Sequence, residues 1–224
     1  MKIFNLLILS FGLCLLSACI KDDFVEDRVD PVLRITTTVD TIEIDTDFQF
    51  EEMYLNLIGQ EEEVTATWKS ADASIISIDD SGLATALMMG STIISVEYDD
   101  GATILTAAMT VVVGQSTVIS NPSTSGSIAT TSSYDLQGDF EYKETATGVE
   151  LIFADNYEAS TALPGLYIYL SNNRNSVANA LEISAVEVFN GAHEYSIEGV
   201  GFNDFQYILY FCKPFNVKVG DGEL

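Results

Sequence analysis

From Pro31 to the C-terminus, short apolar stretches alternate with turn residues. This pattern constrains the fold more than any other feature of the sequence. In the first stretches, Ile42 and Ile44 alternate with charged residues, which is the period of a half-buried strand. The pair Asp100-Gly101 separates two apolar runs and predicts a hairpin turn, because glycine adopts a positive φ without steric cost. No segment has a helical period with capping residues. The pattern predicts an all-β protein of short antiparallel strands.

Composition divides the chain into five segments. We expect a signal peptide at 1–18, a disordered acidic tether at 19–30, a first β domain at 31–113, a polar linker at 114–125 and a second β domain at 126–224. The tether is charged and lacks an apolar period, so it has too little apolar surface to bury in a fold. The linker is rich in Ser and Thr, which predicts modest flexibility between two domains.

The first β domain contains a series of motifs in a characteristic order. They are Trp68-Lys69-Ser70-Ala71-Asp72, Ile75, Ile78, the stretch 80–86 with Ser81-Gly82-Leu83, Gly90, and Ile94-Ser95-Val96. In order and spacing this series resembles the bacterial immunoglobulin-like domain, group 2. The resemblance implies an immunoglobulin-like β-sandwich that serves as a stalk or adhesive module. Trp68 is the sole tryptophan, and we expect its ring, which buries roughly 200 Å², to fill the core between the sheets.

The second β domain carries two distinctive blocks, 164–171 (Pro-Gly-Leu-Tyr-Ile-Tyr-Leu-Ser) and 207–217, which includes a cysteine. They resemble the DM-thirteen domain, a family described as an electron-transfer module that often accompanies DOMON domains. The resemblance covers nearly the whole segment and implies a second antiparallel β-sandwich or barrel-like domain. Two departures weaken an inherited metal or haem role. Gly165 stands where the family has an acidic residue, and Tyr134 stands where it often has a histidine.

The stretch Phe205–Cys212 is almost entirely apolar, which predicts a central strand covered on both faces. Strand alternation places Cys212 on the same face as Ile208 and Tyr210, and Lys213 on the other face. A cysteine on such a strand is a candidate for a buried core residue, because free cysteine is among the most buried residue types.

Cys212 is also the candidate redox or ligand residue of this chain. Cys14 leaves with the signal peptide and Cys19 is expected to carry lipid, so Cys212 is the single free thiol and no disulfide within the chain is expected. Three interpretations stay open: a buried core residue, a redox thiol or prosthetic-group ligand favoured by the adjacent Lys213, and an intermolecular disulfide. A buried core cysteine needs no cofactor, and we expect no cofactor. The alternative is haem or another prosthetic group at Cys212.

Residue types for ordinary catalytic or metal chemistry are scarce in this sequence. His193 is the only histidine, and its place after Gly191-Ala192 predicts a surface loop. A haem or zinc site of the usual kind needs more nitrogen or sulfur ligands than that. The serines lack a Gly-x-Ser-x-Gly elbow, and the paired carboxylates are typical of solvated turns. We expect no catalytic residues and no metal site, and the sequence favours a protein that is not an enzyme.

The N-terminus resembles a bacterial lipoprotein signal. A positive start leads into an apolar stretch too short to span a bilayer, and Leu16-Ser17-Ala18-Cys19 closes it. The resemblance implies cleavage before Cys19, whose thiol then carries a diacylglyceryl anchor. The alternative is an ordinary cleaved signal with a chance cysteine. The acidic residues that follow resemble a surface-export signal, so we expect an outer-membrane lipoprotein exposed at the cell surface; the alternative is a protein that faces the periplasm.

The formal net charge of −25 limits the partners of this chain. It excludes a surface that neutralises nucleic-acid phosphates, and it disfavours direct docking on anionic lipid headgroups. We therefore expect a lipid-anchored cell-envelope protein whose immunoglobulin-like stalk presents a β-rich domain to an unknown envelope or extracellular ligand. The membrane is a partner only through Cys19. The alternative is an electron-transfer module that uses Cys212.

Overall fold

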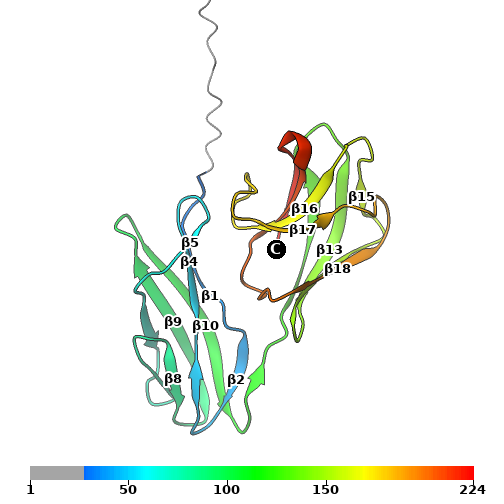
Figure 1. Ribbon diagram of the computed structural model, residues 1–224. Helices are drawn as coiled ribbons and strands as arrows, with labels where there is room; N and C mark the ends of the chain where they lie inside the picture. The colour runs from blue at the N-terminus through cyan, green and yellow to red at the C-terminus, as the bar shows by residue number, and fades with distance from the viewer. Residues whose placement is uncertain (1–27) are drawn as a thin grey trace, which may run out of the picture.

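The computed structural model describes residues 28–224, which form two β-rich domains (Figure 1). The predicted all-β fold is confirmed: the only helical element of the described residues is the 3-10 turn η1 (Lys213–Phe215). The signal peptide, Cys19 and most of the tether lie outside the described residues.

The first domain is a sandwich of three sheets. The largest has the strand order β11-β2-β10-β9-β6, and the two smaller sheets have the orders β1-β4-β5 and β3-β8-β7. Their strands are β1 (Val32–Ile35), β2 (Val39–Glu43), β3 (Asp47–Gln49), β4 (Glu52–Leu55), β5 (Glu61–Glu62), β6 (Thr67–Ser70), β7 (Ile76–Ile78), β8 (Leu83–Ala86), β9 (Gly90–Asp99), β10 (Ile104–Gly114) and β11 (Val118–Ile119). The pairing of β2 with β10 is parallel, and every other pairing in this domain is antiparallel.

Trp68 lies in the core of the first domain, as expected. Its side chain is only 4% exposed and packs beside Phe50, with 6.0 Å between the ring centroids. The core draws residues from all three sheets, among them Leu33, Val96 and Ala84. The indole is therefore one of the large apolar groups that pack the layers of this small sandwich together.

The hairpin predicted at Asp100-Gly101 joins β9 to β10, which pair over ten residues each. Gly101 has a φ of 87°, which a residue with a Cβ adopts only at a steric cost. The carboxylate of Asp99 accepts a hydrogen bond from the Gly101 amide at 2.9 Å, so the side chain satisfies a backbone donor of the turn. The structure therefore confirms the hairpin turn predicted at Asp100-Gly101 and the need for glycine in it.

Strand residues make up half of the expected linker at 114–125, and the rest is irregular backbone. β11 pairs with β2, and the Ser120 side chain donates a hydrogen bond of 2.7 Å to Asp40. The next strand, β12, starts at Ser123. The Thr117 side chain also accepts a hydrogen bond from the Glu43 amide, so part of this segment contacts the first domain, and residues 120–122 connect β11 to β12.

The second domain is one nine-stranded sheet with the order β17-β16-β19-β20-β12-β13-β14-β18, and β15 pairs with β13. Its sheet is rolled into a nearly closed barrel around a single core. The strands are β12 (Ser123–Thr130), β13 (Leu136–Glu144), β14 (Gly148–Phe153), β15 (Glu158–Ala159), β16 (Leu166–Ser171), β17 (Leu181–Ala185), β18 (His193–Glu198), β19 (Tyr207–Cys212) and β20 (Val217–Glu223).

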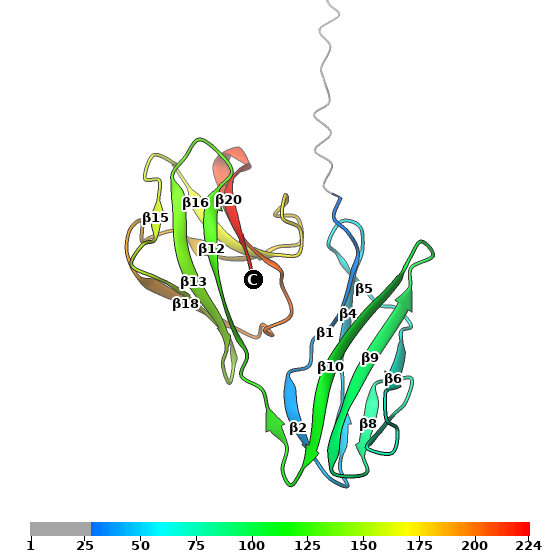
Figure 2. The same ribbon diagram turned by 180° about the vertical axis from the view of Figure 1, so that it is seen from behind.

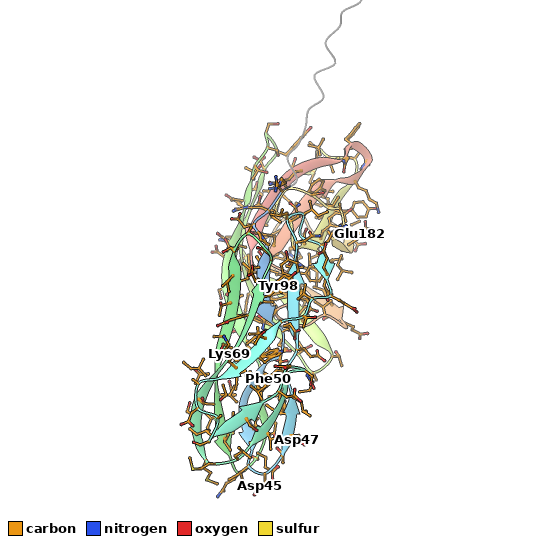
Figure 3. All side chains as sticks on the ribbon, turned by 90° about the vertical axis from the view of Figure 1, so that its left-hand side faces the viewer. Asp45, Asp47, Phe50, Lys69, Tyr98 and Glu182 are labelled. Carbon is orange, nitrogen blue, oxygen red and sulfur yellow. The ribbon has the colours of Figure 1, made fainter. Side chains whose placement is uncertain are left out.

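The second domain lies beside the first and not beyond it (Figures 1 and 2). The chain runs down the first domain, passes residues 120–122 at the lower end, and folds back so that η1 lies at the upper end, where the described chain begins. Figure 3 shows the same arrangement from the side, with Glu182 near the upper end and Asp45 at the lower end. A stalk with the second domain at its far tip is therefore not the arrangement seen.

Candidate functional site

Cys212 is the last residue of β19, and it is enclosed by the core of the second domain. Its Cα pairs with Leu166 of β16 on one side and Val217 of β20 on the other. The residue is 1% exposed and shares the barrel core with Ile208 and Tyr210, as the strand alternation predicted. It is the only free cysteine of residues 28–224.

The outer face of β19 is covered as well, which confirms the expectation of a central strand. Leu209 and Phe211 are buried there with Tyr169. Partly buried apolar residues of the segment before β17, Val177 and Ala180, pack against them. Access to the strand from either side therefore requires movement of packed side chains.

Lys213, the neighbour expected to favour a thiolate, is engaged on the other side of the chain. Its ammonium donates to both carboxylate oxygens of Glu182, at 2.9 and 2.6 Å, and stands 4.6 Å from the Tyr167 ring centroid. The hydrogen bond from Lys213, followed by that from Tyr169, lowers the pKa of Glu182. The charge of Lys213 thus stabilises a carboxylate on the surface.

A group of polar atoms lies inside the same barrel core. The hydroxyls of Tyr157 and Tyr210 are buried and interact with each other, and Nε2 of His193 is buried without a hydrogen-bond partner among the described residues. Burial raises the pKa of Tyr157 to about 12 and that of Tyr210 well above its usual value. Both phenols are therefore neutral at physiological pH.

His193 is not a surface-loop residue, which corrects the prediction from sequence. It opens β18, stacks on Phe153 with 4.9 Å between the ring centroids, and meets the edge of Tyr157 at 4.4 Å. Its Nδ1 lies 3.0 Å from the carbonyl oxygen of Gly191. The sequence did carry a signal, because His193, Tyr195 and Ile197 alternate along one strand face.

The two domains are joined by a polar junction centred on Arg34 of β1. Its guanidinium donates to the Asn172 side chain at 2.8 Å and to the backbone carbonyl of Phe205 at 3.3 Å. Asn203 donates to the carbonyl of Ile35 at 3.3 Å, which adds a second bond between the domains. Nothing in the sequence singled out Arg34, because its partners lie more than 130 positions away.

The β4–β5 turn of the first domain also contacts the second domain, nearer the upper end of the molecule. Asn173 donates to the carbonyl of Ile58 at 3.4 Å. Gly59 has a φ of 72°, and a Cβ at this position would lie 2.8 Å from the carbonyl oxygen of Asn172. Glycine is therefore required here both by the turn conformation and by the close approach of the second domain.

The junction buries polar groups whose pKa values are shifted from their usual values. Burial lowers the pKa of Arg34 although Asp204 opposes the shift, and burial raises the pKa of Tyr142. Nε of Arg34, the Tyr142 hydroxyl and one oxygen of Glu144 are buried there without a hydrogen-bond partner among the described residues. Buried polar atoms without partners cost about 1–3 kcal/mol each, which makes them candidates for contact with water or a ligand.

Cavities follow this junction along its length. One of about 580 Å³ is lined by Glu51, Glu52 and Glu61 to Glu63 of the first domain and by Asp204 of the second. A second, of about 630 Å³, lies between Gln60 and Leu181, and a third, of about 310 Å³, lies beside Arg34 and Phe202. Each is lined by both domains, so the relative placement of the domains creates a cleft with an acidic wall.

Within residues 28–224, no group of three or more His, Cys, Asp and Glu side chains is placed to hold a metal ion. None of the described helical segments is long and apolar enough to cross a bilayer. No protein-family model matches this chain, and no curated protein sequence is significantly similar to it.

Proposed function

We propose that this chain is an outer-membrane lipoprotein, anchored through Cys19 and exposed at the cell surface, that binds an envelope or extracellular partner without catalysis. The signal-like N-terminus supports the anchor. The nearly complete burial of Cys212 supports a core role for this thiol over a redox role.

The observation that carries the proposal is the cleft between the domains, which both domains line. Ligand sites form preferentially where domains meet, because walls from two bodies bury more of a ligand than one surface does. The wall built by Glu51, Glu61 and Glu63 attracts positively charged groups, and an acidic cleft focuses that attraction. The partner that fits best is therefore a basic peptide or basic protein surface.

Loss of the anchor cysteine tests the cellular placement. Cys19→Ala removes the thiol that accepts the lipid, so we expect the variant to accumulate uncleaved or to leave the outer-membrane fraction. The measurement is fractionation of cells with detection of the protein and the mass of its N-terminal peptide. Cys212→Ala is the matched control and should fractionate as the unsubstituted protein does. A Cys19→Ala protein that is normally processed and remains in the outer membrane would refute the anchor.

Neutralising the acidic wall tests the binding surface. We expect Glu51→Gln, Glu61→Gln and Glu63→Gln together to weaken binding of an oligolysine peptide at low ionic strength, because three charges that face one cleft act on the same ligand. The control removes three exposed carboxylates elsewhere, in Glu187→Gln, Glu141→Gln and Asp155→Asn. Titration calorimetry compares the two variants. Equal losses would mean that only the net charge attracts the peptide and that the cleft is no site.

A further inference from the structure

We propose that the upper end of the molecule is a membrane-docking surface that lies against the phospholipid bilayer carrying the lipid anchor. The proposal rests on the anchor at Cys19 proposed above. We define this docking end by four exposed apolar residues on two turns: Leu57 and Ile58 in the β4–β5 turn, and Phe215 and Val217 around η1. Both turns lie at the end where the described chain begins (Figures 1 and 2).

The turn η1 presents an aromatic ring to the outside on a stiff support. Phe215 is 68% exposed, and no residue of the turn is buried, so the ring adds nothing to the core. Pro214 fixes the start of the turn, and Asn216 ends it in the left-handed conformation with a φ of 50°. The Lys213 amide donates to the carbonyl of Gly165 at 3.0 Å and ties the turn to the barrel. A rigid exposed Phe is suited to the interface of a bilayer.

The β4–β5 turn presents its apolar pair where the chain enters the first domain. The Val29 amide donates to the carbonyl of Leu57 at 2.8 Å, at the beginning of the described residues. Asn173 of the second domain holds the same turn through Ile58. The apolar pair of this turn is thus fixed beside the point at which the tether meets the folded protein.

The basic residues of this acidic chain gather towards the same end. Four of the seven Lys and Arg residues in 28–224 are Arg28, Arg174, Lys213 and Lys218. Arg28 and Arg174 line one hollow with Tyr207 and Leu57. Long basic side chains beside apolar ones extend towards lipid phosphates and bury their alkyl stems.

The carboxylates that face these cations are few. Arg174 and Lys218 share the single carboxylate of Asp221, Lys213 pairs with Glu182, and Asp30 lies with Arg28 in the hollow. The acidic residues of the tether and Glu61 to Glu63 adjoin this end, so the cations there reduce its negative charge without removing it. The docking therefore depends on the apolar side chains more than on the charges.

The length of the tether brings the docking end to the bilayer. Nine residue steps separate Cys19 from Arg28, and a fully extended chain of this length reaches roughly 30 Å. The lipid anchor therefore holds the docking end within about one domain length of the membrane. Weak contact by a few apolar side chains is sufficient under these conditions, because anchoring makes the second contact intramolecular.

Quenching by brominated lipids tests this orientation on the full lipidated protein. The protein is reconstituted into phosphatidylcholine and phosphatidylglycerol vesicles with brominated acyl chains, and Phe215→Trp is compared with Met89→Trp. Met89 is 51% exposed in the β8–β9 loop, which adjoins Asp45 at the lower end (Figure 3). The unsubstituted protein gives the background from Trp68. We expect the added Trp at 215 to shift to shorter wavelength and lose fluorescence, and the Trp at 89 to do neither.

The possible results separate the docking surface from the anchor. Protein that does not float with the vesicles would overturn the lipid anchor on which the proposal depends. Protein that floats but shows no quenching at position 215 would overturn the docking surface and leave the anchor intact. Equal quenching at positions 215 and 89 would also overturn it, because the molecule would then lie on the membrane without a preferred end.

Discussion

The Trp68→Ala variant is expected to lose roughly 3–5 kcal/mol of the stability of the first domain, enough to unfold it at moderate temperature. The indole is 4% exposed and no neighbouring aromatic replaces its volume between the sheets. The second domain has a separate core, so its own unfolding transition should remain close to that of the unsubstituted protein. Scanning calorimetry of the full chain measures both transitions.

Leu87→Ala is the matched control for this experiment. Leu87 belongs to the same domain but is 48% exposed, so its truncation should change stability by no more than about 0.5 kcal/mol. If Trp68→Ala lowers both transitions by the same amount, the hydrogen bonds at Arg34 couple the two domains into one cooperative unit. Independent folding of the domains would then be wrong.

The thiol of Cys212 is expected to react at least about 1,000-fold more slowly with a thiol reagent in the native protein than in denaturant. At 1% exposure the sulfur is reached only through local opening, and an opening free energy of about 4 kcal/mol corresponds to that factor. The measurement is the labelling rate at neutral pH followed by absorbance. Cys212→Ala should show no labelling, which assigns the signal to this residue.

The stability of Cys212 variants is a second test of the core role of this residue. Cys212→Ser places a hydroxyl in an apolar core and should cost about 1–3 kcal/mol, while Cys212→Ala should cost less because no polar group is buried. Rapid stoichiometric labelling of the folded protein would contradict the core role and make electron transfer through Cys212 the leading function.

Local features of this fold were predictable because short-range physics decides them. The Asp100-Gly101 turn needs only its own residues, and the burial of Cys212 follows from the parity of one strand. The hydrogen bond that Ser120 of the expected linker donates was not predictable, because its partner Asp40 lies 80 positions earlier. Composition alone does not reveal such a partner.

The arrangement of the two domains could not be predicted from the sequence, because it also depends on residues that lie far apart in the chain. Arg34 stands in a strand where alternation predicts an outward side chain, and a charged residue there needs no explanation. Its role emerges only when Asn172 and Phe205 are brought to it by the folding of a different domain. The cleft and its candidate binding surface therefore form only when the two folded domains pack against each other.

The position of β1 has a mechanical consequence. This strand follows the tether directly, pairs with β4 of the first domain, and reaches the second domain through Arg34 and Ile35. A force applied at the N-terminal end of β1 therefore reaches both domains through one strand, and not one domain after the other. Because only a few hydrogen bonds join β1 to the second domain, we expect these contacts to break before either domain unfolds under such a force.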